Sequence, residues 1–300
     1  MKGKGPRLSA QKTESLWGYL FILPNFIGTV IFLFIPIVFS LYISFHKWDM
    51  INAPIFVGLT NYTKRMVEDT QFHVALWNTA VYSFFSIPIS IALALLVAWL
   101  LSEKLRGTEI FRSIIFIPVI LSMVAVSMVW RWLLNGDYGI LNYLLGLVGI
   151  DSINFLGDER YAMASVIGIG IWKNLGFNVV ILIAAFKEIP ASFYEAAELD
   201  GASPGRKFFN ISLPLIYPSL LFVTIMSVIN SFQVFDIIYT TTQGGPGNAT
   251  QVIYYYIWQN AFKFFDMGYA SALSWVVFLV IFVLTILQMR FSKKRMGFIE

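Results

Sequence analysis

Long apolar stretches alternate with short polar segments along this 300-residue chain. Six of the apolar stretches reach the roughly 20 residues that an α-helix needs to cross a bilayer. They lie at about residues 17–45, 74–101, 110–133, 161–186, 214–241 and 267–290. The pattern therefore predicts an all-α membrane protein with six transmembrane helices.

The composition agrees with a chain that lies in lipid. Hydrophobic residues make up 58% of it and charged residues 13%, against about a quarter charged in an ordinary soluble domain. There is no cysteine, which excludes disulfides, thiolate metal sites and cysteine nucleophiles. The basic residues form no cluster of the kind that binds nucleic acid. We therefore expect the chain to contact membrane lipid and not to bind nucleic acid.

The basic residues separate by side of the predicted membrane. The two terminal segments and the loops at 102–112 and 187–213 hold 14 Lys and Arg residues, and the opposite loops hold 6. Because cytoplasmic loops carry the excess of Lys and Arg, both termini and the 187–213 loop are predicted to be cytoplasmic. The predicted domains are a cytoplasmic segment 1–16, a six-helix membrane domain 17–290 and a cytoplasmic tail 291–300.

The 187–213 loop has the signals of two short helices. Ser192 and Glu195 fit a capping box, in which each side chain bonds the backbone of the other. Gly201 suits the left-handed position that closes a helix, and Ser203–Pro204 is a typical helix start. We predict a helix–glycine–helix elbow on the cytoplasmic face. These residues alone leave open a simpler interpretation, in which Glu195 only caps the helix and Gly201 only turns the chain.

The spacing within this loop resembles that of the membrane subunits of binding-protein-dependent ABC importers. The residues that carry the resemblance are Glu195, Ala196, Ala197, Gly201, Ile211, Leu213 and Pro214. Residues 56–62 (FVGLTNY) and 244–250 (GGPGNAT) are similar to motifs of the maltose-, lactose- and glycerol-phosphate-type permease subunits. The resemblance implies a type I ABC importer permease fold and half of a translocation pathway for a sugar or sugar derivative.

The same resemblance implies how the chain is driven and with what it assembles. The elbow would dock on an ATP-hydrolysing subunit through Glu195, Ala196, Ala197, Asp200, Gly201, Ile211, Leu213 and Pro214. The expected partners are a second, different permease subunit, two ATP-binding subunits and an extracytoplasmic solute-binding protein. The sequence contains no phosphate-binding loop, so we expect no cofactor on this chain and ATP with Mg²⁺ on the partner. The expected location is a bacterial or archaeal plasma membrane.

In the family, the third, fourth and fifth spans line the transport cavity. The matching positions here are Ser122, Met123, Asn174, Phe177, Ser227, Asn230 and Ser231. Asn and Ser are neutral donors and acceptors that suit sugar hydroxyls, but such residues also join membrane helices to one another. Lys173 and Asp236 are ionisable residues within spans, and the sequence leaves open whether they contact substrate or support packing.

No catalytic or metal-binding constellation is evident, so we expect a transporter subunit and not an enzyme. His46 and His73 have no metal-ligand spacing and are predicted to be solvated loop residues. One alternative is an ABC permease for a non-sugar solute, for which Lys173 could bind an anionic group. Another is an ion-coupled secondary transporter, although that class tends to carry paired carboxylates and repeats that we do not find.

Overall fold

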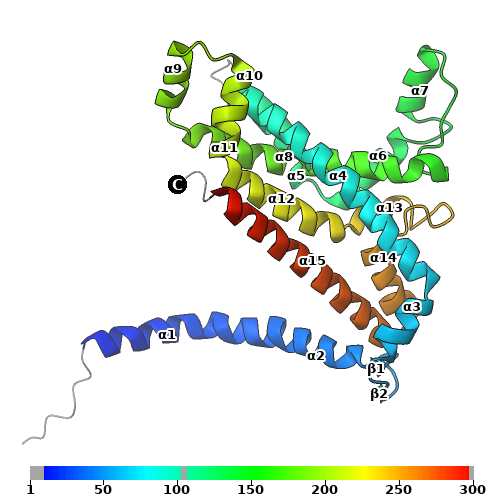
Figure 1. Ribbon diagram of the computed structural model, residues 1–300. Helices are drawn as coiled ribbons and strands as arrows, with labels where there is room; N and C mark the ends of the chain where they lie inside the picture. Colours follow the sequence, from blue (N-terminus) through cyan, green and yellow to red (C-terminus); the bar gives the residue numbers. More distant parts are fainter. Residues whose placement is uncertain (1–9, 103–106, 297–300) are drawn as a thin grey trace, which may run out of the picture. The chain divides into compact units, whose positions relative to one another are not determined.

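The computed structural model describes residues 10–102 and 107–296, and side chains within 14–102 and 107–292 (Figure 1). Residues 1–9 and 297–300 of the predicted terminal segments lie outside these residues, as do Lys104 and Arg106. Their boundaries and orientation stay predictions. The chain divides into two compact units, which we describe separately.

The first unit contains residues 1–65 and 260–275. Its helices and strands before residue 66 are α1 (Ala10–Thr29), the π-helix η1 (Val30–Phe34), α2 (Ile35–Ser44), β1 (His46–Lys47), β2 (Ile55–Phe56) and the π-helix η2 (Asn61–Arg65). The two short strands form an antiparallel pair in which His46 lies opposite Phe56. Two further helices have residues in both units: the π-helix η4 (Gln259–Lys263) and α15 (Met267–Met296).

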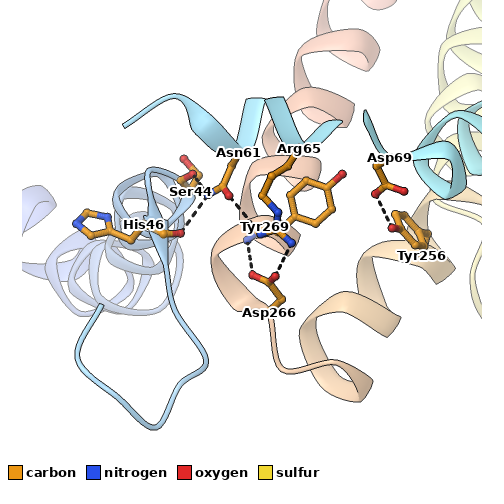
Figure 2. Close-up of polar contacts among 8 residues, drawn as sticks. All are labelled: Ser44, His46, Asn61, Arg65, Asp69, Tyr256, Asp266 and Tyr269. Atoms are coloured by element: carbon orange, nitrogen blue, oxygen red, sulfur yellow. Dashed lines mark hydrogen bonds and ion pairs between the residues drawn. The ribbon is translucent and has the colours of Figure 1, made fainter. Parts of the chain in front are cut away.

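Buried polar contacts hold the end of α2 in this unit (Figure 2). Asn61 of the 56–62 motif is 1% exposed, and its Nδ2 donates to the carbonyls of Ser44 at 2.9 Å and His46 at 3.1 Å. Arg65 pairs with Asp266 at 2.6 Å and lies over the ring of Tyr269. The prediction for His46 was wrong: it is buried rather than solvated, because its ring packs against the chain and bonds a backbone carbonyl.

The second unit contains residues 66–259 and 276–300. Its further helices are α3 (Met66–Glu68), α4 (Thr70–Ser102), α5 (Thr108–Ile120), α6 (Met123–Leu133), α7 (Ile140–Leu147), α8 (Glu159–Glu188), α9 (Ala191–Leu199), α10 (Pro204–Lys207), the π-helix η3 (Phe208–Ser212), α11 (Leu213–Leu215), α12 (Tyr217–Phe232), α13 (Asp236–Thr241) and α14 (Ile253–Trp258). Tyr256 of α14 donates a hydrogen bond of 2.6 Å to Asp69, just before α4 (Figure 2).

Length and apolar character confirm a membrane-spanning helical protein. Among the described residues, five helical segments are long and apolar enough to cross a membrane, and a sixth if one bent pair is counted as a single span. The bent pair is α5 and α6, which meet at 100°. The prediction of one helix over 110–133 therefore missed a break at Leu121–Ser122, where both residues are extended. The apolar run continues through the break, so hydropathy alone gives no sign of it.

Helices α4 and α8 pack side by side and form the framework of the second unit (Figure 1). Ala94 and Ala98 of α4 are fully buried in a cluster with Leu182 and Ile183 of α8. Small side chains of this kind let two membrane helices approach closely. At the start of α8, Asp158 caps the helix, and its hydrogen bond with the Arg160 side chain lowers the pKa of the Asp158 carboxyl to about 2.

Candidate transport pathway and coupling elbow

A narrow cavity of about 40 Å³ lies between α4, α8 and α12. Five of the predicted pathway residues line it: Asn174, Phe177, Ser227, Asn230 and Ser231. They come from two helices far apart in sequence, so the fold brings together positions that the sequence selected by residue type and family match. Whether they contact a transported solute stays a prediction.

A second cavity of about 350 Å³ adjoins the first and shares Tyr82, Gly170, Asn174 and Asn230 with it. Its other lining residues are Met123, Lys173, Gln233, Val234, Phe235, Asp236 and Ile237. Non-helical backbone between α12 and α13, at residues 233–235, forms part of its wall. Irregular backbone is tolerated at membrane depth where it borders protein or a water-filled cavity.

Ser122 is the one predicted pathway residue that lines neither cavity. It is exposed and occupies the N-cap of α6, immediately after the break that ends α5. Met123, the next residue, does line the larger cavity. The bend therefore places these two neighbouring residues in different surroundings.

Sequence reasoning missed four polar residues of the cavity wall: Tyr82, Ser86, Ser90 and Asn178. The first three lie four residues apart along α4 and so share one face of that helix. This polar row inside an apolar helix was the available signal, but the family resemblance pointed to other spans. Asn178 donates to the Ser90 hydroxyl at 3.1 Å and so joins α8 to α4.

Several polar groups of the cavities make no contact that would join helices. Asn174 donates to the Gly170 carbonyl, one turn earlier in its own helix. Among the described residues, Tyr82, Ser227 and Asn230 have no side-chain hydrogen bond partner. Their hydroxyl and amide groups are therefore available to a solute or to water, whereas Asn178 serves packing.

Lys173 has a protein partner although it lines the larger cavity. Its ammonium donates to the Val119 carbonyl near the end of α5 at 2.8 Å. Asp236 lines the same cavity from the first turn of α13. No ion pair joins Lys173 to a carboxylate among the described residues.

The polar loop after α8 forms the expected elbow of α9 and α10 (Figure 1). Gly201 has a φ of +68°. The amide of Gly201 donates to the Glu198 carbonyl at 3.0 Å and that of Ala202 to the Ala197 carbonyl at 2.9 Å, which is the Schellman pattern. Ser203 caps α10, as predicted, by accepting a bond from an amide of its first turn.

The predicted capping box is wrong. The N-cap of α9 is Pro190, without a side-chain cap, and Ser192 is the second residue inside the helix. Pro190 has an extended ψ of 136°, as an N-cap needs, and its ring fixes φ. Glu195 consequently has no capping role and remains exposed on the helix surface.

The elbow is braced internally but exposes its outer surface. Lys207 of α10 pairs with Glu198 of α9 at 2.6 Å, and the hydroxyls of Tyr194 and Ser212 lie 2.9 Å apart. No residue of α9 is buried, and Leu199 is 91% exposed. Of the predicted docking residues, Glu195, Ala196, Asp200 and Gly201 are exposed and Ala197, Ile211, Leu213 and Pro214 are partly buried.

An exposed helical elbow after α8 and a polar cavity among α4, α8 and α12 are the features expected of a transport permease subunit. Comparison with known proteins shows the family: residues 86–297 match the binding-protein-dependent transport system inner membrane component. This chain belongs to that family.

Its relatives include carbohydrate permeases. The trehalose/maltose transport system permease protein MalF of Thermococcus litoralis is 34% identical over 284 residues, covering 94% of this chain and 95% of the relative. The lactose transport system permease protein LacF of Rhizobium radiobacter is 33% identical over 295 residues, covering 96% and 98%. A chain of a bacterial ABC transporter involved in alginate import has the same fold, with a TM-score of 0.85 at 23% identity, over 96% of this chain and 99% of that one.

Proposed function

We propose that this chain is one of two permease subunits in an ATP-driven importer and that its cargo is a sugar or sugar derivative. The observation that carries the cargo is a set of uncharged groups that have no partner among the described residues: Tyr82 on α4, and Ser227 and Asn230 on α12, on two walls of one pathway. Sugars present many neutral hydroxyls, and buried polar groups that meet them gain about 1 kcal/mol or more for each bond made. The sugar-transporting relatives support the same cargo.

The elbow is proposed to transmit the ATPase cycle to the pathway. Ala196 and Ala197 allow close backbone approach to a partner, and Glu195 and Asp200 offer carboxylates to a basic residue there. Since Glu195 does not cap α9, a role in capping no longer accounts for it. Leu199 adds an exposed apolar group to the same surface. The proposed assembly contains a second permease subunit, two ATP-binding subunits that hold ATP and Mg²⁺, and an extracytoplasmic solute-binding protein.

The orientation is part of the proposal. With both termini and the elbow in the cytoplasm, the excess of basic residues lies on the cytoplasmic side. The larger cavity, beside residues 233–237, then lies nearer the outside than the narrow one, beside Ser90 and Asn178. A solute delivered from outside would enter the larger cavity first.

Reconstitution tests the function directly. The complete importer in liposomes should take up a neutral oligosaccharide only with ATP inside and the binding protein outside, whereas this chain alone should transport nothing. Uptake by the chain alone, driven by a proton gradient, would favour an ion-coupled transporter. ATP-dependent uptake of amino acids or inorganic anions but of no sugar would refute the proposed cargo.

The role of the elbow has its own test. Glu195→Ala should leave membrane insertion intact and weaken binding of the ATP-hydrolysing subunit, with Glu109→Ala in α5 as a control substitution of another exposed carboxylate. Equal amounts of ATPase subunit co-purifying with the wild type and Glu195→Ala would contradict docking through this residue.

A further inference from the structure

The bend between α5 and α6 leaves a helix end inside the membrane domain. The final carbonyls of an α-helix have no donor in the next turn of the same helix. Here Leu121, with a ψ of 146°, carries the chain away from the α5 axis before α6 begins. In a bilayer an unsatisfied carbonyl is strongly unfavourable, because hydrocarbon offers no hydrogen bond.

Lys173 satisfies one of these carbonyls. Its ammonium is 2.8 Å from the Val119 carbonyl, one residue before the last residue of α5. Lys173 lies near the middle of α8, about 21 Å from the start of that helix, where a charged side chain needs a partner or water. A cation at a helix C-terminus also interacts favourably with the helix dipole.

A second contact holds the same two helices one turn away. Gly176 of α8 lies against α5 so closely that an added Cβ would collide with the Ile115 carbonyl oxygen. The helices run antiparallel, with Ile115 beside Gly176 and Val119 beside Lys173. The end of α5 is thus fixed at two successive turns, and Met123 follows directly in the wall of the larger cavity.

We propose that Lys173 is a positioning residue that fixes the α5–α6 bend and thereby the wall of the transport cavity. It acts through the Val119 carbonyl and not through a bond to the solute. The effect on transport rests on the proposed function, but the effect on the bend does not. The two effects are therefore measured separately.

The absence of native cysteines allows the bend to be measured in the assembled importer. Spin labels at Ile114→Cys and Met128→Cys, both exposed positions on the two arms, report the distance across it by pulsed electron resonance. Lys173→Met removes the ammonium and keeps much of the apolar stem. Lys173→Arg keeps a cationic donor and is the matched control.

We expect Lys173→Met to broaden the distance distribution and to lower uptake by about tenfold, as loss of a hydrogen bond to a charged group predicts. Lys173→Arg should restore both. A narrow, unchanged distance in Lys173→Met with a raised half-saturating sugar concentration would show that Lys173 is a solute ligand and overturn the proposal. A broadened distance with normal uptake would also overturn the proposal, because it would show that the geometry of the bend does not affect transport.

If the importer transports no sugar at all, the proposed function fails, but the distance measurement still decides whether Lys173 holds the bend. Poor assembly of Lys173→Met is covered by a second variant, Gly176→Ala, whose added methyl group collides with the Ile115 carbonyl and so displaces α5 at its other contact. That variant should also broaden the distance, and an unchanged distance in it would count against fixation of α5 by these contacts.

Discussion

Gly201 is the position at which one added side chain should disturb the elbow most. Its φ of +68° lies in the left-handed region, where L-residues pay about 1–2 kcal/mol and Asn is tolerated best after Gly. No atom lies within 4 Å of the place that a Cβ would take, so the cost is backbone strain alone. Gly201→Val should therefore strain the turn, and Gly201→Asn is a control that adds a side chain with little strain.

The elbow has little stability with which to absorb this strain. Helix α9 has nine residues, no side-chain N-cap and no buried residue. Isolated helices this short are marginal in water. Because each 1.4 kcal/mol or so changes an equilibrium about tenfold, a strain of this size should raise the ratio of unformed to formed elbow about five- to thirtyfold. The long spans are separate from this turn, so insertion should be normal.

The assay is binding-protein- and sugar-stimulated ATP hydrolysis per assembled complex in nanodiscs, with co-purified ATPase subunit measured in parallel. We expect Gly201→Val to lose most of the stimulation and Gly201→Asn to stay close to the wild type. Full stimulation in Gly201→Val would show that the loop is only a turn. An equal loss in Gly201→Asn would show that the left-handed conformation is not the cause.

Further measurements test the cavity and the start of α8. Tyr82→Phe removes one available hydroxyl and should raise the half-saturating sugar concentration about fivefold or more, at a cost of about 1–3 kcal/mol, while Tyr143→Phe on the exposed α7 should change nothing. Asn230→Leu should lower uptake without loss of partner subunits, and a parallel fall in both would identify Asn230 as a packing residue. Asp158→Asn should lower the melting temperature at neutral pH. Because the folded pKa of Asp158, about 2, lies below the ordinary aspartate value of 3.8, the carboxylate stabilises the fold above pH 3.8, and this contribution disappears as the pH falls through about 2. The melting difference between Asp158→Asn and the wild type should therefore shrink in acid, and a difference independent of pH would contradict it.

The sequence predicted those features that depend on local residue chemistry. Gly201 and Ser203–Pro204 mark turns that few other residues can make, and both lie where predicted. The prediction of the N-cap of α9 was wrong because Ser192 and Pro190 are both acceptable N-cap residues. The choice between them depends on how the chain leaves α8. The break at Leu121–Ser122 was also missed, since its stabilising partner, Lys173, lies 54 residues from Val119 in the sequence.

The pathway residues likewise separate into those that the sequence predicted and those that only the fold revealed. Asn174 and Asn230 attract attention as polar residues in apolar spans, and the family match selected them. Tyr82 is only one of 14 tyrosines until the fold brings it beside Gly170 in the wall of both cavities. Residue type could nominate candidates, but only the packing of α4 against α8 separates wall residues from lipid-facing ones.

Under the proposed coupling, the direct attachment of the elbow to α8 gives that helix a mechanical role. Helix α8 ends at Glu188, with two residues between it and α9, and lines the cavity at Asn174. These 14 residues of helix form a lever arm about 21 Å long, so a tilt of about 5° at the elbow displaces Asn174 by about 2 Å. Since α4 is packed tightly against α8, the two helices would swing together. A displacement of that size is enough to break hydrogen bonds between α8 and a bound solute, so under the proposed coupling a small stroke at the elbow would release cargo within the membrane.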